Sequence, residues 1–208
     1  MSLSRPLIAV TLALAFSVSA TAFAAGDVAR GKVISYTCLG CHGIEDYHNA
    51  YPDYNVPRLA GQHADYIVAA LKAYKDGDRQ HATMQVQAAT LSDQDMADIA
   101  AYFAAETNVK PEPSAAPVPA KVTQLCVSCH GKDGVGVAST YPSLASQQAS
   151  YIKEALQEYK SGERKNPVMS TFVVSLSAQD VSEVAEYYAG QSPGLKTLER
   201  QMSLLSSK

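Results

Sequence analysis

One short motif occurs twice in this 208-residue chain, as Cys38-Leu39-Gly40-Cys41-His42 and as Cys126-Val127-Ser128-Cys129-His130. Both copies match Cys-x-x-Cys-His, the attachment signature of c-type haem. Two thiols at this spacing reach the two vinyl groups on one edge of a porphyrin, and the adjacent His then falls under the iron as its proximal ligand. The motifs therefore predict two covalently bound haem c groups, attached through Cys38, Cys41, Cys126 and Cys129, with His42 and His130 as iron ligands.

A single Cys-x-x-Cys pair has three other interpretations: a zinc knuckle, a thioredoxin-like redox pair or a disulfide. Zinc would leave each His crowded against its neighbouring Cys, and a thioredoxin-like motif expects a βαβ pattern that this chain lacks. All four cysteines fall in two complete copies of the longer motif. This usage favours haem attachment over the alternatives.

The first 24 residues have the pattern of a secretory signal. Arg5 is the only charge before an apolar stretch from about Leu7 to Ala20, and Ala22-Phe23-Ala24 gives a small-x-small cleavage site. The alternative is an uncleaved membrane anchor, because the apolar stretch is not much shorter than a spanning helix. We expect residues 1–24 to be removed after export, and no later segment to span a membrane.

The region after each motif repeats at a constant offset of 85 residues. Residues 71–79 align with residues 156–164 at five identities in nine, and residues 91–104 align with residues 176–189 at seven in fourteen. The two cysteine motifs lie 88 residues apart, so the first copy holds three extra residues between His42 and Pro57. The chain is therefore interpreted as an internal duplication with one loop insertion.

The repeat sets the expected domain organisation. Between the copies, a segment with four prolines among small residues is typical of a semi-extended linker. The expected divisions are a signal peptide at 1–24, an N-terminal haem-binding domain at 25–108, a linker at 109–120, a C-terminal haem-binding domain at 121–190 and a C-terminal tail at 191–208.

Each copy has helical periodicity, and no alternating strand pattern competes with it. The last helix of each copy is expected to begin after Ser92 or Ser177, with an acidic residue at the third position of a capping box. The other helices are expected at residues 26–38, 64–74, 121–126 and 149–159. The fold class is all-α, with three to four helices around one haem in each domain. So small a domain could hardly stabilise this fold without a large apolar cofactor.

A methionine pair is the candidate for the sixth ligand of each iron. Met84 and Met169 are the only methionines related by the 85-residue offset, and thioether sulfur favours ferrous iron. The alternative is that both are ordinary core residues. Met96 lacks a Met counterpart and is expected to fill the core. Surface or structural roles are expected for three histidines without a His counterpart, namely His48, His63 and His81.

Two further residue pairs are candidates for contacts around each haem. A backbone carbonyl at Pro57 or Pro142 is positioned in sequence to accept the second N–H of the proximal imidazole, although a turn proline explains the pair equally well. Arg79 and Arg164 are candidate partners of the haem propionates, because a buried carboxylate needs a charged partner. The alternative is that both arginines are solvated at the surface.

Charge argues against a nucleic-acid partner. Residues 25–208 hold 16 basic and 20 acidic side chains, a net charge of −4, so polyanion binding is not expected. The charge is uneven, with a net −5 in residues 25–108 and +1 in residues 109–208. The two halves are therefore expected to present different faces to their partners.

The paired motifs, the Tyr-Lys-x-Gly-x-Arg segments, the methionine that follows and the closing Leu-Ser-x-Gln-Asp helix resemble the dihaem cytochrome c4 family. The resemblance implies a bacterial periplasmic electron carrier, not an enzyme, either soluble or loosely attached to the membrane. It further implies that the protein passes electrons from a quinol-oxidising complex to a terminal oxidase. By the same resemblance, His42 pairs with Met84 and His130 pairs with Met169 as axial ligands.

Two other functions remain as alternatives. One is the dihaem electron-transfer subunit of a larger dehydrogenase such as a flavocytochrome, in which a partner would carry out catalysis. The other is a dihaem peroxidase, which needs one iron with an open or displaceable site, whereas both copies offer a methionine.

Overall fold

A computed structural model of the chain describes residues 25–106, 109, 111–112 and 117–199. The expected signal peptide at 1–24, part of the expected linker and residues 200–208 of the expected tail lie outside the described residues. All regular elements of the described part are helices, as expected for the all-α class. None of the helices in these ranges has the length and apolar character needed to cross a membrane.

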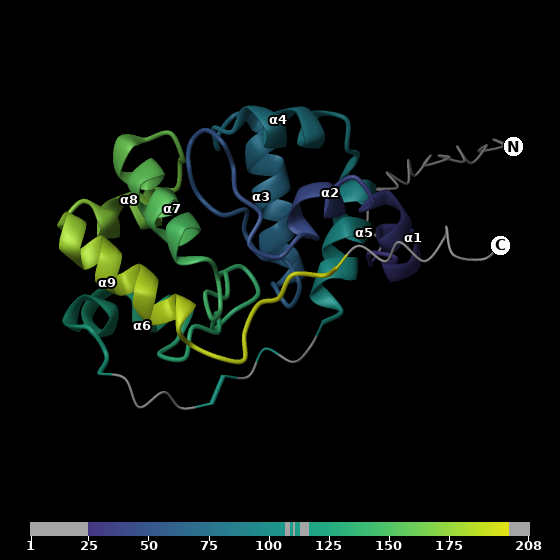
Figure 1. Cartoon of the computed structure of the whole chain (residues 1–208). Helices are drawn as coiled ribbons and strands as arrows, with labels where there is room; N and C mark the ends of the chain where they lie inside the picture. The colour runs from purple at the N-terminus through teal and green to yellow at the C-terminus, as the bar shows by residue number, and fades with distance from the viewer. Residues whose placement is uncertain (1–24, 107–108, 110, 113–116, 200–208) are drawn as a thin grey trace, which may run out of the picture.

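The helices form two groups that lie side by side (Figure 1). The N-terminal group contains α1 (Val28–Ile34), α2 (Leu39–His42), α3 (Ala64–Asp76), α4 (Ala82–Ala89) and α5 (Asp93–Ala104). The C-terminal group contains η1 (Val122–Cys126), α6 (Val127–His130), α7 (Ala149–Ser161), α8 (Pro167–Val173) and α9 (Ala178–Ala189). The helices expected at 64–74 and 149–159 are α3 and α7. The one expected at 26–38 ends earlier, at Ile34, before a turn that leads into the first motif.

The two longest paired helices end in the same way. Each buries two apolar residues at i, i+4 spacing, Ile67 and Leu71 on α3 and the equivalent pair on α7. Each then stops at a glycine in the left-handed region, Gly77 at φ 81° and Gly162 at φ 86°, where a side chain would be strained. The stop turns the chain sharply toward the helix that carries the paired methionine.

The expected capping boxes are present at the start of α5 and α9. Ser92 and Ser177 accept the backbone N–H of Asp95 and Asp180, and each aspartate accepts the N–H of its serine in return. These contacts satisfy donors that a helix start would otherwise leave unpaired. The sequence prediction of both helix starts is confirmed.

Each group has its own apolar core. It is formed mainly by the segment around the cysteine motif of that group and by the two long helices of that group. Met96 is fully buried in the N-terminal core, which confirms its expected place there. In the C-terminal core, Val122 of η1 and Tyr188 of α9 are likewise fully buried. Met84 and Met169 pack at the edges of the two cores.

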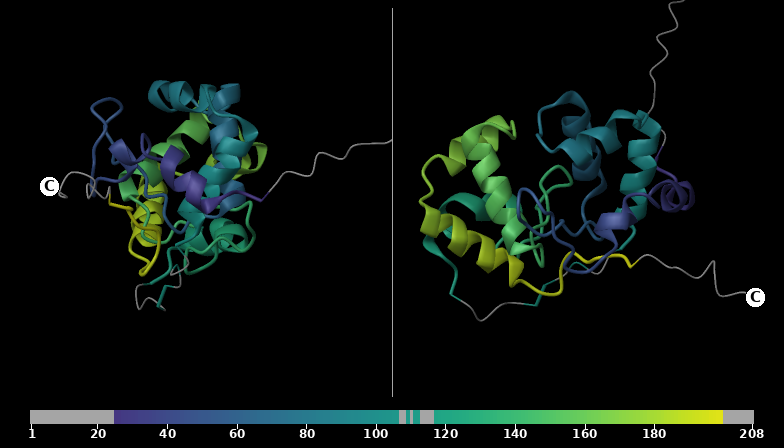
Figure 2. Two further views of the ribbon diagram at one scale, coloured as in Figure 1. Left: turned by 90° about the vertical axis from the view of Figure 1, so that its right-hand side faces the viewer. Right: turned by 45° about the horizontal axis from the view of Figure 1, so that its top comes forward.

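Two segments connect the groups directly. The chain after α9 runs back across both groups (Figures 1 and 2), where Leu195 is buried and the backbone of Lys196 exchanges two hydrogen bonds with that of Ala60. The inserted loop of the first copy reaches α7, where Asn55 accepts a 2.7 Å hydrogen bond from the hydroxyl of Ser150. These contacts hold the two groups together in addition to the Pro-rich segment, whose Glu112 donates its backbone N–H to the Ser192 carbonyl.

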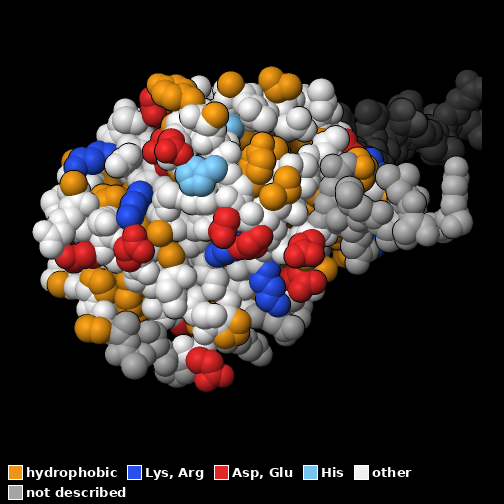
Figure 3. Space-filling view, in the orientation of Figure 1, with side chains coloured by type: hydrophobic (Ala, Val, Ile, Leu, Met, Phe, Trp, Pro, Cys, Tyr) orange, Lys and Arg blue, Asp and Glu red, His pale blue; other side chains and the backbone are white. Residues whose placement is uncertain are grey.

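The surface shows no basic patch on the face in Figure 3. Acidic and basic side chains are interspersed there, with hydrophobic side chains among them. This distribution agrees with the small negative net charge.

Candidate haem-binding cavities

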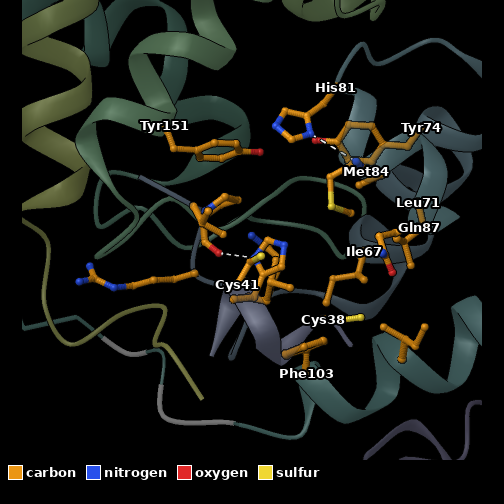
Figure 4. Close-up of a pocket in the computed structure, with 18 of the residues that line it drawn as sticks. Cys38, Cys41, Ile67, Leu71, Tyr74, His81, Met84, Gln87, Phe103 and Tyr151 are labelled. Atoms are coloured by element: carbon orange, nitrogen blue, oxygen red, sulfur yellow. Dashed lines mark hydrogen bonds between the residues drawn. The ribbon is translucent and has the colours of Figure 1, made fainter. Parts of the chain in front are cut away.

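A cavity of ≈ 180 Å³ lies beside the first cysteine motif in the N-terminal group, and residues of the C-terminal group such as Gln147 and Tyr151 complete its lining. Cys38, Cys41 and His42 line it, and so does Met84 from α4. Figure 4 shows Met84 and the two cysteines on opposite sides of this space, with apolar side chains such as Ile67 and Phe103 around it. A natural core contains few voids larger than a water molecule, so a cavity of this size suits a large apolar group.

A second cavity of ≈ 350 Å³ lies beside the other cysteine motif in the C-terminal group, and residues of the N-terminal group such as Tyr66 and Arg79 complete its lining. Cys126, Cys129 and His130 line it, together with Met169 from α8. The structure thus brings each motif and its offset-related methionine to one cavity. Met84 and Met169 lie where the sequence prediction needs them, and their roles as iron ligands are taken up below.

Both motif histidines make the hydrogen bond that the sequence suggested. Nδ1 of His42 donates to the Pro57 carbonyl at 2.8 Å, and Nδ1 of His130 donates to the Pro142 carbonyl at 2.9 Å. Burial lowers the pKa of both imidazoles, although the carbonyl hydrogen bond opposes the shift. A neutral imidazole that donates from Nδ1 keeps the lone pair of Nε2 free to bind a metal.

The four cysteines are unpaired thiols that line the cavities. Burial raises the pKa of Cys38, and it raises the pKa of Cys126 to about 11. Each motif presents two thiols to its cavity, as thioether attachment to a porphyrin edge requires.

Arg79 and Arg164 are buried at the boundary between the cavities, so the interpretation of solvated surface arginines is wrong. Their exposed fractions are 6% and 3%, and their backbones pair as an antiparallel bridge. Arg79 lines both cavities, and Arg164 lines the second. The guanidinium groups stack on Tyr74 and Tyr159, at 4.3 and 4.6 Å from the ring centroids.

The hydrogen bonds of these arginines are incomplete. Arg79 donates from Nη2 to the Tyr151 hydroxyl at 2.9 Å, but its buried Nε has no partner among the described residues. Arg164 donates to the hydroxyls of Tyr66 at 2.8 Å and Tyr151 at 3.4 Å. Glu158 lies 3.7 Å from Arg164. Two buried guanidinium groups with an unsatisfied donor fit the carboxylates of haem propionates.

Tyr151 shows the strength of the positive field at this boundary. Burial alone would raise the pKa of its hydroxyl, but Arg164 and Arg79 together lower that pKa to about 8. Tyr66, its equivalent in the first copy, has a raised pKa because burial outweighs the attraction of Arg164. The field therefore favours an anion next to Tyr151, where both cavities meet.

The three histidines without a His counterpart in the other copy make contacts with neighbouring protein groups. His81 caps α4, where its Nδ1 accepts the backbone N–H of Met84, and Asn166 caps α8 in the same way. Nε2 of His63 donates to the carbonyl of Gly136 at 3.2 Å, and His48 lies 2.7 Å from Asp53. These positions agree with the expected surface or structural roles.

The sequence reasoning missed a third repeated segment, although a signal for it was present. Residues 59–67 align with residues 144–152 at the same offset of 85, with six identities in nine, including Gln62 with Gln147 and Tyr66 with Tyr151. All four of these side chains contact the other copy. The identity of the residues was visible in the sequence, but their partners lie more than 70 residues away.

Comparison with known proteins places both halves among cytochromes. The family model described as cytochrome c matches residues 28–105, and the one described as cytochrome C oxidase, cbb3-type, subunit III matches residues 114–187. A protein named thiosulfate dehydrogenase electron acceptor, from Thiomonas intermedia, is 29% identical over 74% of this chain and 78% of its own length.

Two cytochromes c4 match over nearly their whole length. The crystal structure of reduced recombinant cytochrome c4 from Pseudomonas stutzeri superposes with a TM-score of 0.67 and 28% identity, covering 80% of this chain and all of that one. Cytochrome c4 of Pseudomonas aeruginosa is 34% identical over 87% of this chain and 96% of its own length. Likeness of this extent, in sequence and in fold, makes this chain a dihaem member of the cytochrome c4 family.

Proposed function

We propose that the protein is a periplasmic one-electron carrier of a respiratory chain, which accepts electrons from a quinol-oxidising complex and delivers them to a terminal oxidase. The observation that carries this proposal is the equivalence of the two cavities, each with a Cys-x-x-Cys-His motif and a methionine at the matching position. Two protein ligands per iron leave no position for a substrate, which suits electron transfer and not catalysis.

The proposed ligands are His42 with Met84 and His130 with Met169, and the cysteines of both motifs provide the covalent attachment. When bound, each haem supplies an iron that cycles between the ferric and ferrous states. The carbonyls of Pro57 and Pro142 fix the tautomer and the orientation of each histidine. Arg79 and Arg164 neutralise the propionates, and the apolar linings exclude water.

The proposed location depends on residues 1–24, which we propose are an export signal that is removed. After its removal, only peripheral association with a membrane is expected. The family membership supports this location, because the resemblance to cytochromes c4 implies a periplasmic protein.

A second candidate is an electron acceptor that works with one dedicated dehydrogenase. The similarity to the thiosulfate dehydrogenase electron acceptor of Thiomonas intermedia favours it. Purification of the native protein tests this candidate: constant association with a catalytic subunit would support it, and isolation as a free cytochrome would support the general carrier.

A redox titration followed by absorbance tests the ligands, including the weak near-infrared band that arises from Met–iron coordination. We expect two one-electron components with the band intact. Met84→Leu should abolish about half of the band, because one of the two proposed Met ligands is lost. Met96→Leu is the matched control, since Met96 is buried in the same domain and should leave the band unchanged.

Two results would contradict this proposal. A band that survives Met84→Leu at full strength would remove Met84 from the site. Rapid binding of cyanide to one ferric haem at neutral pH would show an open iron and favour an enzyme such as a peroxidase.

A further inference from the structure

Two glutamines join the domains through a reciprocal pair of contacts. The Gln62 side chain accepts the backbone N–H of Ser143 at 2.8 Å and donates to the carbonyl of Ser143 at 3.0 Å. The Gln147 side chain accepts the backbone N–H of Arg58 at 2.9 Å and donates to the carbonyl of Arg58 at 3.0 Å. Each glutamine is 4% exposed, so these bonds are shielded from water.

The peptide groups that the glutamines bind are the ones that hold the proximal histidines. The N–H of Arg58 and the carbonyl of Pro57 belong to one peptide unit, and that carbonyl accepts the hydrogen bond from His42. In the other domain, the N–H of Ser143 and the carbonyl of Pro142 form the peptide unit that accepts from His130.

The result is two hydrogen-bonded chains, each of which crosses the domain boundary once. One chain runs from Gln147 through the Pro57–Arg58 peptide to His42, and the other runs from Gln62 through the Pro142–Ser143 peptide to His130. We propose that each glutamine is a positioning residue that tunes the reduction potential of the haem in the opposite domain. This inference rests on the proposed ligation of the irons by His42 and His130.

Polarisation of the peptide gives the direction of the effect. A peptide N–H that donates to a glutamine oxygen makes the carbonyl of the same peptide a stronger acceptor, because hydrogen bonds in a chain strengthen one another. A stronger acceptor draws the Nδ1 proton away from the imidazole and raises the basicity of the ligand. A more basic ligand stabilises ferric iron, so each glutamine lowers the potential of the haem across the boundary.

The position of Gln62 makes the crossed effect distinguishable from a local one. Both glutamines line the first cavity, and neither is among the described residues that line the second. The oxygen of each also accepts the N–H of the next residue, His63 or Gln148, which fixes the amide in place. A change at Gln62 therefore reaches the second haem through the Pro142–Ser143 peptide.

The test uses Gln62→Met and Gln147→Met in the full-length dihaem protein, because methionine keeps the length of the side chain and removes both hydrogen bonds. Gln62→Met should raise the potential of the C-terminal haem, and Gln147→Met that of the N-terminal haem. We expect a change on the order of threefold in the equilibrium constant for reduction, about 30 mV for one electron. The haem signals in proton NMR spectra are assigned by contacts to Leu71 in the first cavity and Leu156 in the second.

Ser150→Ala is the matched control. Its hydroxyl also makes two hydrogen bonds across the boundary, both with Asn55, but it contacts neither peptide of the proposed chains. This variant should lose stability and leave both potentials unchanged.

Three results would overturn the inference: potentials that do not move in either glutamine variant, a Gln62→Met variant that shifts only the N-terminal haem, or a Ser150→Ala variant that shifts either potential by as much as a glutamine variant does. Failure of the proposed function is separate, because loss of the Met ligands that it requires would appear as a missing Met–iron band in the unmodified protein.

Discussion

Tyr66 and Tyr151 occupy equivalent positions in the two copies, but they have different hydrogen bonds. The Tyr151 hydroxyl accepts from both buried arginines, whereas the Tyr66 hydroxyl accepts from Arg164 alone. Loss of Tyr151 would leave Arg79, which already has an unpaired Nε, without its hydroxyl partner. Loss of Tyr66 would leave Arg164 its second bond to Tyr151.

We therefore expect Tyr151→Phe to lower the free energy of unfolding more than Tyr66→Phe does. A hydrogen bond to a charged group contributes about 1.5–3 kcal/mol, so we expect a loss of about 3 kcal/mol for Tyr151→Phe and about 1.5 kcal/mol for Tyr66→Phe. Guanidinium unfolding of the two variants under identical conditions measures the difference. Equal losses would show that the second arginine contact of Tyr151 adds nothing.

At the residue scale, the sequence predicts which side chains line the two cavities where a motif or the repeat marks them. The Cys-x-x-Cys-His spacing identifies the cysteines and histidines, and the offset of 85 residues identifies Met84 and Met169. The burial of Arg79 and Arg164 could be predicted only in part. Their charge suggested a carboxylate partner, but their bonds to Tyr66 and Tyr151 depend on how the two domains meet.

At the scale of single helices, the capping box at the start of α5 gives a pH-dependent prediction. Hydrogen bonds from the side chain and backbone of Ser92, and then the nearby Arg30, lower the pKa of Asp95 to about 2. A carboxyl with a lowered pKa in the folded state stabilises the fold above its ordinary pKa, and this contribution disappears as the pH falls toward 2.

Asp95→Asn should therefore destabilise the protein at pH 6, and the difference from the unmodified protein should shrink as the pH falls from about 5 to about 2. Urea unfolding midpoints at several pH values measure this difference. Asp93→Asn, in the same first turn but outside the box, should cost less at pH 6. A difference for Asp95→Asn that stays constant with pH would mean that the carboxylate charge is not what stabilises the helix start.

Helices with strong local signals were predictable, and the others were not. The starts of α5 and α9 follow from serine caps, and the ends of α3 and α7 follow from glycine. The first segments of the two copies differ for non-local reasons. α1 packs against α5, and Gly31 permits close approach to the backbone of Asp98, whereas the second copy has the π-helical η1 in the corresponding place.

At the scale of the whole molecule, the segment after α9 is expected to couple the domains. Leu195 is 2% exposed, its N–H donates to the Ala145 carbonyl, and the next residue pairs with Ala60 of the first domain. The repeat ends before this segment, so the offset of 85 carried no information about it.

Leu195→Ala should lower the free energy of unfolding by about 3 kcal/mol, in the usual range for a buried leucine. It should also separate the unfolding of the two domains, because the backbone pairing at Lys196 loses its buried anchor. Differential scanning calorimetry would show two transitions in place of one. A single transition at the original temperature would mean that the segment after α9 does not couple the domains.

The reciprocal contacts of Gln62 with Ser143 and of Gln147 with Arg58 have the form of an isologous interface, in which one surface meets its own equivalent. Two separate copies of one domain could form such an interface, but every insertion would then occur on both sides of it. A fused chain can carry an insertion once. The loop that reaches Ser150 from the first domain is a difference of this kind. Fusion therefore allowed the two sides of a symmetric contact to diverge, so that selection could act on each haem environment alone.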